Sequence, residues 1–121
     1  MPYHNNWKDN GLYRKFTGEI TGGEILESNL SIHGDPRFDG INYVLNDFIS
    51  IVEFDVNNTD INIISTIDNV AALSKQKLKI AIVATNTDLL KWVNVYLNMM
   101  QDSPYETAVF STCSDALNWA S

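Results

Sequence analysis

The chain has 121 residues, and its content of 45% hydrophobic and 19% charged residues is typical of one soluble globular domain rather than a disordered segment. The formal net charge is −7, from 15 acidic and 8 basic side chains, and basic residues concentrate only at Lys75, Lys77 and Lys79. Because an acidic field repels polyanions, we expect no binding to nucleic acid, and no apolar run approaches the ~18 residues that cross a bilayer.

Cysteine usage and the N-terminal residues indicate the compartment. Cys113 is the one cysteine, so the chain cannot form an internal disulfide, which agrees with a reducing environment. The first ten residues, MPYHNNWKDN, contain no apolar signal core. We therefore expect a cytoplasmic protein, with residues 1–10 as a flexible N-terminal tail and residues 11–121 as a single domain.

The first predicted elements are a strand and a helix. Residues 12–20 alternate between apolar and polar as an edge strand does. The segment Thr21-Gly22-Gly23-Glu24 is typical of a capping box, in which the threonine and glutamate side chains satisfy helix amides reciprocally. The helix should reach His33 with Ile25, Leu26, Leu30 and His33 at helical spacing, and Gly34-Asp35-Pro36 ends it.

The rest of the chain alternates between strand and helix patterns. The almost wholly apolar run 79–84 indicates a strand at the centre of a sheet covered on both faces. The other expected elements are strands at 41–48 and 107–111 and helices at about 59–74, 88–101 and 113–119, the second of them capped by Asn86 or Thr87. This order predicts an α/β fold with a mixed or mostly parallel sheet.

Several segments of the chain are similar to those of a known family. The motifs are G-E-I-T-G-G-E-I-L, D-P-R-F-D, Y-V-L-N-D-F, F-D-V, A-I-V-A and S-P-Y-E, and with them the chain from Gly18 to Trp119 resembles the SpoIIAA-like family of small bacterial proteins. That superfamily includes the STAS domains (sulfate-transporter and anti-sigma-factor-antagonist modules) and is structurally related to the CRAL-TRIO lipid-binding domains. The resemblance implies a four- or five-stranded mixed sheet with helices mainly on one face.

The loop 54–60 has two interpretations. The resemblance implies that it matches the turn that carries a phosphorylated serine in anti-sigma-factor antagonists. Here the segment after Asp55 holds Asn57 and Asn58 in place of the Asp-Ser-Ser-Gly pattern, and Thr59 is its one hydroxyl. Asparagine and threonine are also favoured helix N-caps. The loop therefore predicts either a helix cap or a phosphorylation switch at Thr59.

Other polar residues do not indicate an active site. Acidic and amide groups at the expected carboxyl edge of the sheet (Asp47, Asp55, Asp60, Asn86 and Asp88) match no metal motif, and each suits a cap or a turn. His4, His33 and Cys113 form no recognisable nucleophile arrangement, although Cys113 begins the last helix, a position that can lower a thiol pKa. We expect no enzyme activity, no metal and no cofactor.

The helix 88–101 has the most distinctive pattern. Its central stripe is Leu89, Val93, Tyr96 and Met100, and further apolar residues (Leu90, Leu97, Trp92, Val95 and Met99) widen the apolar arc to about 220°, against the ~100° that packing on one sheet requires. Three interpretations remain open. The surplus packs beneath the helix 59–74 or the N-terminal tail with Trp7, or forms a protein interface such as a homodimer, or belongs to a movable helix pair that covers an apolar ligand or touches a membrane.

These patterns together predict a non-catalytic binding or regulatory module. Its partner would be an apolar or lipid-like small molecule, a membrane surface at the inner membrane, or a protein, engaged through helices 59–74 and 88–101. The residues predicted for this surface are Trp92, Val95, Tyr96, Met99, Ile63 and Ile67. The alternative is a phospho-regulated STAS-type interaction switch at loop 54–60, with Asp55, Asn57, Asn58 and Thr59 as its residues.

Overall fold

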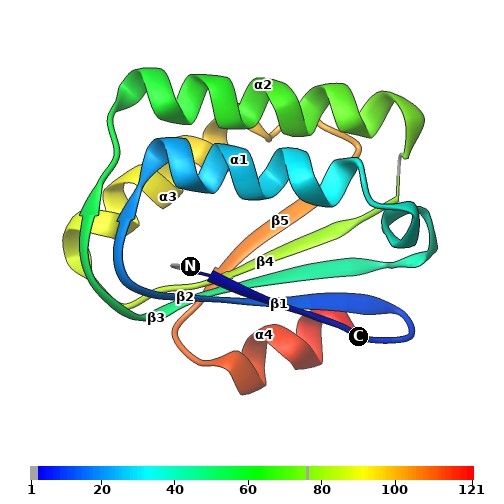
Figure 1. Ribbon diagram of the computed structural model, residues 1–121, viewed down its shortest axis with the longest axis horizontal. Coiled ribbons are helices and arrows are strands. Elements are labelled where there is room, and N and C mark those ends of the chain that lie inside the picture. Colours follow the sequence, from blue (N-terminus) through cyan, green and yellow to red (C-terminus); the bar gives the residue numbers. More distant parts are fainter. Residues whose placement is uncertain (1–2, 76) are drawn as a thin grey trace.

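The computed structural model describes residues 3–75 and 77–121, which form one five-stranded sheet and four α-helices (Figure 1). The strands are β1 (Tyr3–Trp7), β2 (Gly11–Thr21), β3 (Tyr43–Asp55), β4 (Lys79–Val83) and β5 (Glu106–Phe110). The helices are α1 (Gly22–His33), α2 (Asn58–Ser74), α3 (Thr87–Met99) and α4 (Cys113–Ala120), with a short 3-10 helix at Pro36–Gly40.

The spatial order of the strands is the same as their order in the chain. β1 is antiparallel to β2, and β2, β3, β4 and β5 are parallel to one another. Crossover connections between parallel strands are right-handed. When each connection leads to the next strand on the same side, the crossover helices therefore all lie on one face of the sheet. Figure 1 shows α1, α2 and α3 on that face and α4 on the other. The predicted α/β fold, with a mixed sheet and helices mainly on one face, is confirmed.

The N-terminal segment differs from the expected flexible tail. Residues Tyr3–Trp7 pair with β2 from Tyr3↔Phe16 to Trp7↔Leu12, so β2 is an interior strand and not the predicted edge. The guanidinium of Arg37 lies 4.4 Å from the centroid of the Trp7 ring. The strand went unrecognised because three of its five residues are exposed polar side chains, which give an edge strand no apolar alternation.

Strand β3 is longer than the predicted 41–48. Its first part, Tyr43 to Asp47, pairs with β4, and beyond that point β3 pairs only with β2. The β2–β3 register shifts next to Gly18, whose φ of +68° is easily reached only by a residue without a Cβ. The two strands therefore continue as a ribbon beyond the rest of the sheet.

Helix boundaries agree with the predicted caps. At α1 the Thr21 hydroxyl accepts from the Glu24 amide at 3.1 Å, the Glu24 carboxylate accepts from the Thr21 amide at 2.9 Å, and Gly34 is the C-cap. Asn86 caps α3. These local hydrogen bonds satisfy amides that a helix cannot satisfy internally, so each helix begins where its cap stands.

The core has two parts, one on each face of the sheet. The larger lies between the sheet and α1–α3, and the smaller lies between the sheet and α4, where Ala116 and Ala120 pack against Tyr43 and Leu45. β4 contributes to both parts, as its apolar sequence predicts, because Ile80 and Ile82 face one and Ala81 and Val83 the other. Among the described residues no helix combines the length and the hydropathy needed to cross a membrane.

Candidate functional site: an apolar cavity with a buried arginine

A cavity of about 90 Å³ lies between the sheet and helices α1, α2 and α3. Most of its wall is apolar. The sheet contributes Phe16, Val44, Phe48, Ile80 and Ile82, and the helices contribute Ile25, Ile32, Ile61, Ile64, Leu89, Trp92 and Val93. Ile25, Phe48 and Trp92 are half-buried, whereas most of the lining is buried. Such a space suits the apolar part of a small molecule.

One side of the cavity is polar and centres on Arg14 of β2. The Arg14 side chain is only 3% exposed. Its Nη1 donates to Asn29 Oδ1 of α1 at 2.8 Å and to Asn46 Oδ1 of β3 at 3.1 Å, and its Nη2 donates to the Ser28 hydroxyl. Burial lowers the pKa of Arg14 to about 10, so the guanidinium stays charged at neutral pH.

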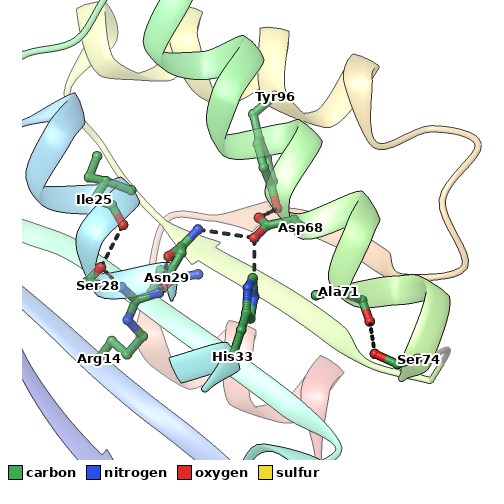
Figure 2. Close-up of polar contacts among 10 residues, drawn as sticks. Arg14, Ile25, Ser28, Asn29, His33, Asp68, Ala71, Ser74 and Tyr96 are labelled. Atoms are coloured by element: carbon green, nitrogen blue, oxygen red, sulfur yellow. Dashed lines mark hydrogen bonds and ion pairs between the residues drawn. The ribbon is translucent and has the colours of Figure 1, made fainter. Parts of the chain in front are cut away.

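The polar side continues to Asp68 on α2 (Figure 2). Its carboxylate accepts from the Tyr96 hydroxyl at 2.6 Å and from Asn29 Nδ2 at 3.2 Å, and it lies 3.5 Å from His33 Nε2. Burial raises the pKa of Asp68 to about 6, while the Tyr96 hydrogen bond and the charge of Arg14 oppose that rise. Burial and Arg14 lower the pKa of His33, which favours a neutral imidazole.

Two polar atoms in the cavity wall are left without a protein partner. They are Arg14 Nε and the Tyr105 hydroxyl, both buried and both without a hydrogen-bond partner among the described residues. Burial raises the pKa of Tyr105 to about 12, so the hydroxyl keeps its proton at neutral pH and can donate it. The cavity therefore joins an apolar wall to uncommitted hydrogen-bond donors.

Sequence reasoning missed this polar cluster because it followed the apolar residues of α1. Ser28 and Asn29 are buried, whereas Leu30, predicted at helical spacing with Ile25 and Leu26, is 52% exposed. The signal was in the strands, where Arg14 stands between the buried Leu12 and Phe16, and Asn46 continues the face of Val44. A charged residue in the inward register of an apolar strand indicates a buried polar site.

The residues predicted for an outer surface on α3 lie mainly inside. Trp92, Val95 and Met99 are half-buried against the core, and Met99 Sδ accepts from the Ser65 hydroxyl of α2 at 3.3 Å. Tyr96 is buried at 7% exposure and bound to Asp68, so it cannot belong to an outward surface.

The two residues of α2 predicted for the same surface differ in their exposure to solvent. Ile63 is 41% exposed, and Ile67 is half-buried. Two further apolar side chains of this helix, Val70 and Leu73, point outward with exposures of 60% and 79%. The apolar excess that reaches solvent therefore belongs to α2 and not to α3.

The loop 54–60 is a helix cap. The Asn57 side chain accepts from the Asp60 amide at 2.9 Å, and the Asp60 carboxylate accepts from the Asn57 amide at 3.0 Å, which makes a reciprocal capping box. The capping interpretation is thus confirmed. Asp55, Asn58 and Thr59 are exposed, and phosphorylation of Thr59 stays a prediction.

The remaining predicted carboxylates do not come together. Asp47 lies beneath α4, where it accepts from the Tyr13 hydroxyl, from the Ile49 amide at 3.0 Å and from Cys113 Sγ at 3.3 Å. Burial and the Asp47 carboxylate raise the pKa of Cys113, contrary to the lowering expected at a helix start. In the part of the chain that the structure describes, no three His, Cys, Asp or Glu side chains form a group able to hold a metal ion.

Comparison with known proteins supports the fold. No protein-family model and no curated protein matches the chain. An uncharacterised protein of the DUF3478 family from Shewanella loihica PV-4, with a SpoIIAA-like fold, is similar with a TM-score of 0.50 and 20% identity, over 98% of this chain and 92% of that one. The unphosphorylated form of the anti-sigma factor antagonist SpoIIAA is similar with a TM-score of 0.60 and 8% identity, over 97% and 96%. This chain therefore has the SpoIIAA-like fold.

Proposed function

We propose that this protein is a non-catalytic binding module that takes a small amphiphilic molecule into the cavity between its sheet and helices α1–α3. The observation that carries the proposal is the combination of an apolar wall with the unpartnered Arg14 Nε and Tyr105 hydroxyl. Binding pockets commonly join apolar walls to a few polar groups that orient the ligand. A buried donor without an acceptor costs free energy, which a ligand acceptor would recover.

Helices α2 and α3 serve this function through their inner faces. Ile64 and Asp68 of α2 line the cavity, and so do Trp92 and Tyr96 of α3. These contacts support a site for the apolar small molecule beneath the two helices rather than on them. Contact with a membrane surface and formation of a homodimer have no comparable support.

A phospho-regulated switch at loop 54–60 is the second candidate. The similar SpoIIAA structure is that of an anti-sigma factor antagonist, and Thr59 is exposed in the first turn of α2, where a phosphate would meet the helix dipole. However, Asn57 already satisfies the Asp60 amide, and the Asp60 carboxylate occupies the same turn. A phosphate there would meet negative charge, so the cavity has the better support.

The test is native mass spectrometry of the purified protein, before and after incubation with amphiphiles of four to eight carbons. Val93→Phe places a larger side chain in the cavity wall, and Val70→Phe makes the same change at a side chain that is 60% exposed. We expect bound amphiphile on the wild type and on Val70→Phe, and at least a tenfold loss on folded Val93→Phe. Equal binding to all three proteins, or none to the wild type, contradicts the proposal.

A further inference from the structure

Arg14 is the charged group in the cavity wall, and the hydrogen-bond partners it has among the described residues are all neutral. Its three acceptors are the amide oxygens of Asn29 and Asn46 and the hydroxyl of Ser28. Within residues 3–75 and 77–121 no carboxylate forms an ion pair with it inside 4.0 Å, and Asp68 is connected to it only through Asn29. Buried charges are normally paired, so the guanidinium is unusual in having no direct counter-ion among the described residues.

Arg14 also has donors to spare. A guanidinium carries five N–H donors, and the three hydrogen bonds above use three of them. The Nε donor is among those left over, although the atom is buried and Arg14 lines the cavity. A planar arginine with free donors matches the two oxygens of a carboxylate in charge and in geometry.

Building on the proposed function, we infer that the cavity selects an amphiphile whose head group is a carboxylate, held by the Arg14 guanidinium through Nε while the chain lies against the apolar wall. An alcohol would leave the guanidinium without a counter-ion, and an amine would place a second positive charge beside it. A phosphate would bring up to two negative charges to one arginine. Among these head groups the carboxylate matches the single charge and the free donor.

The charges around Asp68 predict that carboxylate binding depends on pH. The groups that face Asp68 are Arg14 from β2, His33 from α1, Tyr96 from α3 and Tyr105 before β5. A bound carboxylate adds negative charge beside Asp68, whose pKa burial already raises to about 6, so Asp68 takes up a proton as the ligand binds. Binding linked to proton uptake tightens as the pH falls.

The size of the cavity limits the chain of the ligand. Its volume of about 90 Å³ is smaller than the ~150 Å³ of an engineered cavity that takes up benzene. A short acyl chain suits this space, and a longer one exceeds it. Butanoate and octanoate, each with its alcohol, therefore sample both cases.

The experiment is calorimetric titration of the wild-type protein with butanoate, butan-1-ol, octanoate and octan-1-ol at pH 6 and pH 8. For at least one chain length we expect the carboxylate to bind at least tenfold more tightly than its alcohol, and more tightly at pH 6 than at pH 8. Alcohols that bind as tightly as the carboxylates overturn this inference while leaving the proposed function intact. Failure of all four ligands overturns both.

A pair of matched variants assigns the selectivity to one residue. Arg14→Gln removes the charge from the cavity wall, whereas Arg37→Gln makes the same change at an exposed arginine. We expect Arg14→Gln to abolish the preference for the carboxylate and Arg37→Gln to keep it. A preference that survives in folded Arg14→Gln overturns the role of Arg14. If that variant does not fold, the wild-type comparison of acid with alcohol decides the question.

Discussion

The two faces of the sheet bury polar side chains in opposite ways. Beneath α4, the Asp47 carboxylate accepts from the Tyr13 hydroxyl, the Cys113 thiol and the Ile49 amide, so its oxygens are engaged by neighbouring donors. Beneath α1–α3, a larger network leaves Arg14 Nε without an acceptor beside a cavity. Both faces thus contain buried polar groups, but among the described residues only the face beneath α1–α3 has a buried donor without an acceptor.

This difference follows from the residues that cover each face. The small side chains of Ala116 and Ala120 let α4 approach the sheet closely, and Cys113 of α4 donates across that contact to Asp47. On the other face three helices meet over one sheet, and their inner side chains do not fill the space between them. A satisfied cluster stabilises a fold, whereas an unsatisfied one beside a cavity provides a place for a ligand.

The largest expected effect comes from removing the arginine that organises the open network. Arg14→Leu deprives Ser28, Asn29 and Asn46 of their donor and leaves Asp68 without its compensating charge. Each of these buried acceptors, once left without its donor, costs about 1–3 kcal/mol of unfolding free energy. Urea denaturation at pH 7 measures the loss, and Arg37→Leu, at an exposed arginine, should lose far less. Equal losses would mean that the network does not hold this face together.

The second-largest expected effect is on the pH dependence of stability, which we expect from the face that carries Asp68. The folded pKa of Asp68 is raised from 3.8 to about 6, so its contribution to stability is fully present below pH 3.8 and is lost as the pH rises through 6. The loss amounts to at most about 3 kcal/mol by pH 7.

Asp68→Asn should abolish this slope, because its side chain does not titrate. Denaturant unfolding between pH 4 and pH 7 gives the unfolding free energy of the wild type and of Asp68→Asn, and the contribution of Asp68 is the difference between the two slopes. His33, whose pKa burial lowers, contributes to the pH dependence in the opposite direction. Parallel curves for the two proteins would show that Asp68 is not the buried titrating group.

A smaller effect is expected beneath α4. Asp47→Asn replaces one acceptor oxygen by an amide donor that faces other donors, which should cost about 1–2 kcal/mol of unfolding free energy. Because Asp47 lies on the face away from the cavity, carboxylate binding by the folded variant should stay within twofold of the wild type. Weakened binding would show that the two faces are coupled.

The smallest effect belongs to the cap of α2. Asn57→Ala removes the acceptor of the Asp60 amide and should cost about 1 kcal/mol in thermal or urea unfolding. Thr59→Ala, two residues later, has no capping bond to lose and should stay within about 0.5 kcal/mol of the wild type. The reverse order would show that Thr59, rather than Asn57, stabilises the helix start.

Much of the fold was open to prediction because its signals are local. The capping boxes at Thr21 and Asn57 lie within four residues of chain, and the apolar strand β4 is recognisable without its neighbours. The long apolar helix α3 was also expected close to its observed limits. Strand β1 was not, because its polar residues become a strand only by pairing with β2.

The candidate site was much less predictable, since its members are far apart in the chain. Arg14 and Asn46 are 32 residues apart and Asn29 and Asp68 are 39 apart, so no spacing rule relates them. The apolar surplus of α3 was correctly seen, but its direction depends on α2 and the sheet. Thus Tyr96, expected on a surface, donates to a buried carboxylate instead.

By itself, the sequence determined the α/β alternation, the helix caps, the central strand and the resemblance to SpoIIAA-like proteins, because each depends on neighbouring residues or on a short motif. The tertiary structure alone decided which apolar residues face inward, that Arg14 is buried without a direct counter-ion, and that a cavity lies beside it. The physical reason is that burial and the pairing of charges are properties of packed elements, and packing brings together residues that the chain keeps apart.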